Sequence, residues 1–152
     1  MENLPYDRTD AKSIEAFAKK LLGKTFEEVI KELPSYEEIA KEFGDKKRKG
    51  GLGNLLEKFY FRYQINSDRN ADFKEAGVEL KVTPYEITAT KKQMKAGERL
   101  VLTMIDYNNP IEPELEQSHL WEKCKVLLLI YYLRDKSLLN NLQYRIDFVS
   151  LF

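Results

Sequence analysis

The chain has 152 residues, which is enough for one compact domain with a hydrophobic core and too few for two ordinary domains. It carries 25 Lys and Arg against 25 Asp and Glu, so its formal net charge is zero. This balance disfavours a protein that coats nucleic acid through general positive charge. A nucleic-acid binder of this composition must gather its cations on one face.

Cysteine content and hydropathy narrow the class of protein further. The single cysteine, Cys124, excludes an internal disulfide and a cysteine-based zinc site. The N-terminal residues Met1–Arg8 lack the apolar core of a signal peptide. The longest apolar run, Val126–Leu133, is far shorter than the roughly 20 residues that a membrane helix needs. We therefore expect a soluble cytoplasmic protein without a membrane segment.

The first part of the chain predicts short helices. Thr9 or Asp10 is placed to cap a helix whose apolar residues recur at helical spacing until Gly23. The pairs Thr25–Glu28 and Ser35–Glu38 have the spacing of capping boxes, so each predicts one further helix. These helices carry no concentrated chemistry, and we interpret them as scaffold.

A basic loop precedes the next expected helix. The cations Lys46, Lys47, Arg48 and Lys49 are followed directly by a glycine pair. A solvated loop is the ordinary explanation of such a run. The alternative is contact with phosphate, because glycine lets the backbone approach a ligand and a helix N-terminus favours anions.

The apolar residues after this loop predict an amphipathic helix over residues 51–64. They share one helical face: Leu52, Leu55, Leu56, Phe59, Tyr60 and Tyr63. Glu57 lies at the border of that face. Its carboxylate either reaches solvent along the side of the helix or points toward the following strand as an acidic group, and its position alone leaves both open.

The alternation of apolar and polar residues from Val78 to Thr83 predicts a half-buried strand. Side chains two apart on a strand point the same way, so Glu79 and Lys81 are expected on the face away from the core. Pro84 is expected where the strand ends.

Asp72 changes the interpretation of Glu79 and Lys81, which alone would be a solvated pair worth little. Two carboxylates that converge on one point hold a hard divalent cation such as Mg²⁺. A lysine beside them can position water and stabilise charge that develops on a phosphate. Asp followed by Glu-x-Lys on a strand is the layout of a metal-dependent nuclease core. Because these residue types are common, the pattern depends on the motifs around it.

The remainder of the chain predicts more strands. Tyr85–Gly97 is polar and lysine-rich, which suits a mobile hairpin connection or a flap. Arg99–Tyr107 is apolar on both sides and is expected to be a central strand. Lys125–Leu133 predicts a buried strand, and Tyr144–Phe152 predicts a final one. The sum is an α+β fold, with helices around a mixed sheet of about four to five strands.

Several blocks follow one another in a recognisable order: Lys49–Glu57, Ala71–Phe73, Ala76–Pro84, Gly97–Leu102 and Ser118–Lys123. In residues, order and spacing they resemble the MutH family of GATC-directed endonucleases, which includes the mismatch-repair nicking enzyme and related type II restriction enzymes. Two of the blocks look closer to the restriction enzymes. The resemblance covers roughly residues 45–135 and implies a restriction-endonuclease-like core, which we expect over residues 45–152. The helices expected before it form a helical arm over 1–44 of the same single domain.

Carried over position by position, the resemblance implies a metal site and a catalytic lysine. Asp72 and Glu79 would ligate Mg²⁺ with the carbonyl of Leu80, and Lys81 would be the catalytic lysine. Glu57 would be the helix carboxylate that completes the acidic site.

The resemblance also implies residues beyond this group. Lys123 would reach the active site from a later segment. Lys49 would lie near the DNA backbone, and we expect Lys46, Lys47 and Arg48 to contribute to DNA binding beside it.

The expected function is that of a Mg²⁺-dependent type II restriction endonuclease domain that hydrolyses phosphodiester bonds of double-stranded DNA at GATC sites. A mismatch-repair nickase that needs a protein activator and a non-cleaving DNA-binding module of the same fold are the alternatives. Family members continue past the strand at Tyr144–Phe152 with elements that read bases, so we expect a chain truncated at its C-terminus. The residues do not fix the oligomeric state.

Overall fold

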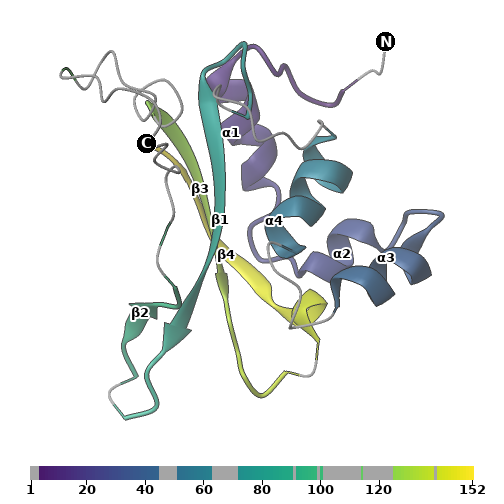
Figure 1. Cartoon of the computed structure of the whole chain (residues 1–152), viewed down its shortest axis with the longest axis vertical. Helices are drawn as coiled ribbons and strands as arrows, with labels where there is room; N and C mark the ends of the chain where they lie inside the picture. The colour runs from purple at the N-terminus through teal and green to yellow at the C-terminus, as the bar shows by residue number, and fades with distance from the viewer. Residues whose placement is uncertain are drawn as a thin grey trace, which may run out of the picture.

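The structure is a computed structural model that describes residues 4–44, 51–62, 72–90, 92–98, 100, 114, 125–138 and 140–152. Its helices lie on one side of a mixed four-stranded sheet (Figure 1). The strands are β1 (Val78–Ile87), β2 (Met94–Ala96), β3 (Val126–Leu133) and β4 (Arg145–Leu151). Their order in the sheet is β2-β1-β3-β4.

The pairing of the strands confirms the expected α+β fold. The inner strands β1 and β3 run parallel, in register from Val78 opposite Val126 to Tyr85 opposite Leu133. The outer strands β2 and β4 pair antiparallel with them. The strands predicted near the C-terminus are confirmed as β3 and β4. The strand expected at Arg99–Tyr107 lies outside the described residues, apart from Leu100.

The N-terminal helices begin where the capping residues predict. They are α1 (Ala11–Lys19), α2 (Phe26–Ile30) and α3 (Tyr36–Phe43). Asp10 caps α1, and the Thr25 hydroxyl accepts a hydrogen bond from the Glu28 amide at 3.3 Å. Ser35 precedes α3 but makes no side-chain capping bond. Its expected capping box is therefore wrong, because the backbone at Ser35 does not take the extended conformation of an N-cap.

The helix expected over residues 51–64 changes its geometry halfway. Gly51–Leu55 (α4) is α-helical, whereas Leu56–Phe61 (η1) is a π-helix that ends at Arg62 with a left-handed φ of 57°. Bonds between residues five apart widen the turn, so Phe61 follows Leu56 onto the buried face. Both side chains are fully buried. The expectation of one continuous α-helix is therefore wrong from Leu56 onward.

β1 is longer than the sequence predicts, because it continues through Pro84 to Ile87. The Pro84 carbonyl accepts a hydrogen bond from the Gly97 amide at 3.0 Å. The amide nitrogen and carbonyl of one extended residue point to the same side, so the donor that proline lacks would face β2. The ladder with β2 covers only Tyr85–Ile87. Proline is tolerated within β1 because the strand edge at which Pro84 lacks an N–H donor lies just past the end of β2.

A hairpin joins β1 to β2, as expected for part of Tyr85–Gly97. The Thr88 amide donates to the Gln93 carbonyl at 2.8 Å. The Gln93 amide donates to the Thr88 hydroxyl at 3.0 Å. These two bonds close the turn and fix the position of β2 at the edge of the sheet.

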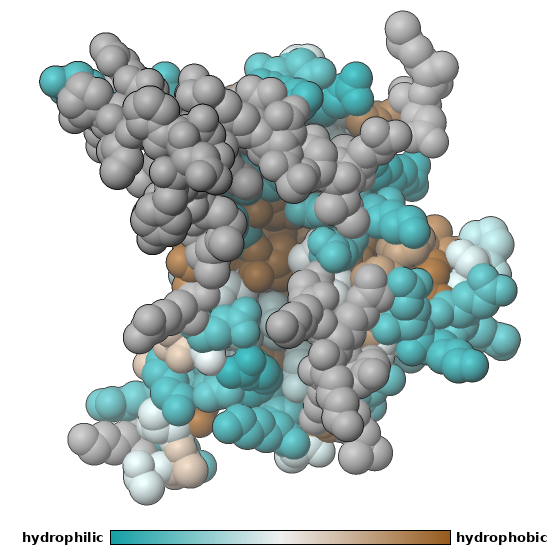
Figure 2. All heavy atoms as spheres, viewed as in Figure 1, coloured by the Kyte–Doolittle hydropathy of each residue, from teal (hydrophilic) through white to brown (hydrophobic). Residues whose placement is uncertain are grey.

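One hydrophobic core joins the helices to the sheet. Figure 2 shows hydrophobic residues along the middle of the molecule and hydrophilic residues toward the outside. The fully buried members come from both layers: Ile14, Ala18, Leu21, Phe26, Ile30, Leu55, Leu56, Phe61, Val78, Leu128, Ile130 and Ile146. Val78 and Leu80 of β1 point into this core, so Glu79 and Lys81 lie on the opposite face of the sheet.

Within the described part of the chain, no helix combines the length and the apolar character that crossing a membrane requires.

An aromatic cluster joins the N-terminal segment to η1. Tyr6 stacks on Phe17 with ring centroids 4.8 Å apart, and Phe17 stacks on Tyr60 at 4.2 Å. The Tyr6 hydroxyl donates to the Phe61 carbonyl and the Tyr60 hydroxyl to the Phe17 carbonyl, both at 2.6 Å. Tyr6 and Phe61 also meet the edge of the Phe73 ring. The cluster therefore reaches the loop that precedes β1.

The half-buried Tyr60 predicts a loss of stability at alkaline pH. Burial raises the pKa of Tyr60 from 10.0 to about 12. A raised pKa means that this stabilisation is complete below pH 10 and is lost as the pH rises toward 12. We expect the free energy of unfolding to fall over this range, and to fall less in Tyr60→Phe. Urea unfolding followed by circular dichroism at several pH values measures how the free energy of unfolding changes with pH in both proteins. An equal pH dependence in the wild type and in Tyr60→Phe would contradict a contribution from the raised pKa of Tyr60.

Candidate active site

Two hydrogen bonds between side chain and backbone hold Asp72 and Glu79 together. The Asp72 amide donates to Glu79 Oε2 at 3.0 Å, and the Leu80 amide donates to Asp72 Oδ2 at 2.9 Å. Each carboxylate thus fixes the backbone beside the other. We call this reciprocal arrangement the carboxylate interlock.

A tight turn brings the interlocked residues into contact. Phe73 and Val78 form an isolated antiparallel bridge, with amide-to-carbonyl distances of 2.8 and 3.2 Å. Gly77 has a φ of 67°, the left-handed conformation that glycine adopts without steric cost. The sequence therefore folds back here because Gly77 permits the turn and the buried Phe73 anchors it.

Lys81 places a cation beside the carboxylate interlock. Its Nζ lies 3.5 Å from Glu79 Oε1, and the exposed fractions of the two side chains are 18% and 4%. A carboxylate buried this deeply is costly unless it is paired and hydrogen-bonded. Glu79 has the Asp72 amide on one oxygen and the Lys81 ammonium near the other. Lys81 is the more exposed of the two side chains.

The donor set suits a hard divalent cation. Asp72 and Glu79 supply carboxylate oxygens and Leu80 a carbonyl, which are the ligands that Mg²⁺ prefers. A carboxylate has two oxygens with about four acceptor positions, so a bond to a backbone amide leaves room for a metal. Across the described residues, no three His, Cys, Asp or Glu side chains group closely enough to hold a metal ion. The described residues therefore offer two carboxylates at this position, Asp72 and Glu79, as metal ligands.

Of the other predicted site residues, the structure describes Glu57 alone. Glu57 lies half-buried in η1, just after α4, which packs against β1. A Cβ at Gly53 of α4 would lie 3.8 Å from Val82 of β1, an ordinary packing distance. The role of Glu57 as a third carboxylate stays a prediction. Lys123 and the cations of the basic loop, Lys46–Lys49, lie outside the described residues.

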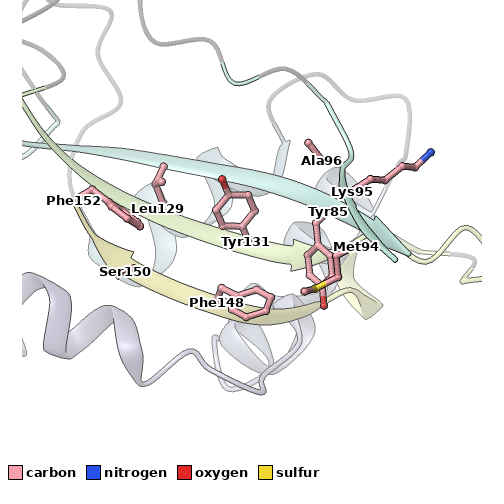
Figure 3. A pocket seen from close by; sticks show the side chains of 9 residues that line it. All are labelled: Tyr85, Met94, Lys95, Ala96, Leu129, Tyr131, Phe148, Ser150 and Phe152. Atoms are coloured by element: carbon pink, nitrogen blue, oxygen red, sulfur yellow. The ribbon is translucent and has the colours of Figure 1, made fainter. Parts of the chain in front are cut away.

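An apolar groove on the same face of the sheet was not predicted from the sequence. It has a volume of about 470 Å³, and residues of all four strands line it (Figure 3). Its lining residues are Tyr85, Met94, Lys95, Ala96, Leu129, Tyr131, Phe148, Ser150 and Phe152. Leu129 pairs in register with Lys81, so the groove begins beside the candidate site. The signal for it in the sequence is the spacing of two between Leu129 and Tyr131 and between Phe148, Ser150 and Phe152, which puts each set on one face of its strand.

The mixed sheet flanked by helices is the fold of a restriction-endonuclease-like domain. The family model described as DNA mismatch repair enzyme MutH matches residues 61–152. Type II restriction enzyme Sau3AI of Staphylococcus aureus is 33% identical over 115 residues, which are 76% of this chain and 21% of that protein. The chain belongs to the MutH family. It spans 21% of the length of that relative.

The family match includes Asp72, Glu79, Lys81 and Lys123, because all four lie within residues 61–152. Glu57 and the basic loop lie before the matched range. Asp72, Glu79 and Lys81 are therefore the predicted site residues that lie both within the family match and in the described part of the structure.

The interlock predicts a difference between two substitutions of Asp72. Asp72→Ala removes the acceptor of the buried Leu80 amide, which should lower the free energy of unfolding by about 1–3 kcal/mol. Asp72→Asn keeps an oxygen in that place, so its loss should be smaller. Glu75→Ala, at a side chain 49% exposed, is the control and should change stability by less than about 0.5 kcal/mol. Urea unfolding compares the three, and equal losses in both Asp72 variants would contradict the interlock.

Proposed function

We propose that this chain carries the catalytic site of a Mg²⁺-dependent endonuclease that hydrolyses phosphodiester bonds of double-stranded DNA at GATC sites. The observation that carries the proposal is the interlock of Asp72 and Glu79 with Lys81 at 3.5 Å from Glu79. Membership of the MutH family and the similarity to a type II restriction enzyme support it.

The proposed roles follow from where each group lies. Asp72, Glu79 and the Leu80 carbonyl would hold Mg²⁺, which when bound lowers the pKa of a water ligand and neutralises charge on the scissile phosphate. Lys81 donates hydrogen bonds from its ammonium, so it can orient the attacking water and stabilise the charge that develops on phosphate oxygens. Its 18% exposure leaves it accessible to a phosphate, while Glu79 keeps its position.

Six further residues belong to the proposal, two of them in the catalytic group and four in the basic loop. Glu57 and Lys123 would complete the catalytic group. The basic loop at Lys46–Lys49 would contact the DNA backbone, since its cations are the kind of group that neutralises phosphates.

A second candidate function is a mismatch-repair nickase that acts with a protein activator. The description of the family model favours it, since that description names a repair enzyme. A nickase converts supercoiled plasmid to the open circle, whereas a restriction enzyme cuts both strands and gives linear fragments. The cut pattern therefore separates the two functions that share this site.

Cleavage of unmethylated plasmid with GATC sites, in Mg²⁺ or Mn²⁺ at low salt, tests the proposal. We expect the wild-type chain to cut, and Asp72→Asn and Lys81→Ala to cut at least about 100-fold more slowly. Each variant removes a group that acts on the reacting phosphate or its metal. Glu75→Ala, which removes an exposed carboxylate three residues from Asp72, should cut like the wild type.

A plasmid of similar size that lacks GATC serves as the specificity control and should stay intact. Activity retained by Asp72→Asn or Lys81→Ala would contradict the proposed mechanism. A wild-type chain that leaves the GATC plasmid uncut would contradict the proposed function for these residues.

A further inference from the structure

The ring of Tyr6 contacts aromatic residues on both sides of the chain segment that leads into the candidate site. Phe61 is the last residue of η1, and Phe73 follows Asp72 directly. The Tyr6 ring lies edge-on to both, with ring centroids 6.0 Å from Phe61 and 6.2 Å from Phe73. Phe61 and Phe73 also contact each other, with centroids 5.4 Å apart. The three rings therefore pack as one group, although they come from separate parts of the sequence.

A hydrogen bond fixes Tyr6 within this group. Its hydroxyl donates to the Phe61 carbonyl at 2.6 Å. Phe61 ends η1, and the carbonyls in the last turn of a helix lack partners within the helix. Tyr6 thus supplies a partner to a backbone carbonyl at the end of η1, while its ring packs on Phe73. One side chain restrains both ends of the segment before β1.

The chain beside Tyr6 is itself tied to α1. The Asp7 amide donates to the Ser13 hydroxyl at 2.8 Å. Asp7 Oδ1 accepts from the Thr9 amide at 2.9 Å and from the Thr9 hydroxyl at 2.6 Å. The Tyr6 ring stacks on Phe17 of the same helix. Tyr6 is therefore held from the side of α1, by contacts that do not involve β1.

Phe73 links this aromatic group to Asp72, because one peptide bond joins the two residues. The backbone of Phe73 is bridged to Val78 of β1, and its side chain is buried, with 3% exposed. The bridge holds the backbone of Phe73, whereas the neighbouring rings hold its side chain. A change in that packing is expected to move the Asp72 backbone, and with it the carboxylate that accepts from the Leu80 amide.

We propose that Tyr6 is a positioning residue: its packing on Phe73 holds the Asp72 carboxylate at the Leu80 amide, where it is placed to bind a divalent cation with Glu79. The proposal rests on the proposed function, which makes Asp72 a metal ligand. Groups that orient metal ligands matter because their loss typically costs about 10–100-fold in metal affinity. Tyr6 lies before the residues that the family model matches, so this support comes from outside the matched range.

Tyr60 offers a matched control, because it shares most of the contacts of Tyr6. Its hydroxyl also donates to a carbonyl at 2.6 Å, that of Phe17, and its ring stacks on Phe17 and lies edge-on to Phe61. In the described part of the chain, no ring contact joins Tyr60 to Phe73. Tyr60→Leu therefore removes comparable packing and one equal hydrogen bond from the same cluster, but leaves the contact between Tyr6 and Phe73.

Amide hydrogen exchange, followed by NMR in the metal-free protein, tests the proposal. The Leu80 amide donates to Asp72, so its exchange rate reports whether that carboxylate stays in place. The Ile146 amide, which donates to the Lys24 carbonyl at 2.9 Å, is the reference for opening elsewhere in the fold. Tyr6→Leu should raise the ratio of the Leu80 rate to the Ile146 rate by about ten-fold or more. Tyr60→Leu should leave this ratio within about three-fold of the wild type.

Two further variants test which part of the Tyr6 side chain acts. Tyr6→Phe keeps the ring on Phe73, so it should restore a ratio near that of the wild type. Phe73→Leu removes the other ring of the same contact and should raise the ratio as Tyr6→Leu does, which tests the proposal even if Tyr6→Leu does not fold. Thermal melts establish which variants are folded. Equal ratios in Tyr6→Leu and Tyr60→Leu, or a wild-type ratio in Phe73→Leu, overturn the proposal.

Isothermal titration calorimetry with Mg²⁺ connects this positioning role with the proposed function. Tyr6→Leu should bind Mg²⁺ about ten-fold more weakly than the wild type, whereas Tyr60→Leu should bind it equally. Equal Mg²⁺ affinity in these two variants would count against the proposal. Failure of the proposed function would appear differently. The wild-type chain would then bind no Mg²⁺, while the exchange ratio would still separate the two leucine variants and support the positioning of Asp72 by Tyr6.

Discussion

The carboxylate interlock is the constraint on which the rest of the site depends. Asp72 lies in a loop, and loops seldom hold a side chain to within the tolerance that a metal or a phosphate needs. The bond from the Leu80 amide fixes Asp72 to the regular strand, and the bond from the Asp72 amide fixes Glu79 in turn. Behind the loop, Phe73 packs into the aromatic cluster around Tyr6 and Phe61. The N-terminal helices thereby support the site without contributing chemistry to it.

The sequence predicted the elements whose signals are local. The alternation from Val78 to Thr83 requires Glu79 and Lys81 to leave the core, and the structure places both on the face away from the helices. The caps at Asp10 and Thr25 fix where helices begin, because one side-chain oxygen satisfies one backbone amide. These contacts span few residues, so their spacing in the sequence is enough to find them.

The features that the sequence missed depend on contacts between distant residues. The π-helix at Leu56–Phe61 places Phe61 against Phe73 and Tyr6, and no local pattern encodes that packing. β1 continues through Pro84 because β2 ends where the missing donor would be needed. A polar cleft of about 500 Å³ at the end of β1 gathers Lys92, Lys95, Arg134 and Lys136 from the β1–β2 hairpin and the turn after β3. In the sequence these cations are scattered, whereas the basic loop before α4 is contiguous and was noticed for that reason.

The central claim is that the interlocked carboxylates form a divalent-metal site, and metal binding tests it without reference to cleavage. Isothermal titration calorimetry of Mg²⁺ against the wild-type chain should show saturable binding. Asp72→Asn keeps the acceptor for the Leu80 amide but lacks the charged ligand, so it should lose that binding while staying folded. Glu75→Ala should bind Mg²⁺ like the wild type. Mg²⁺ binding of equal strength by Asp72→Asn and the wild-type chain would contradict the assignment of this site.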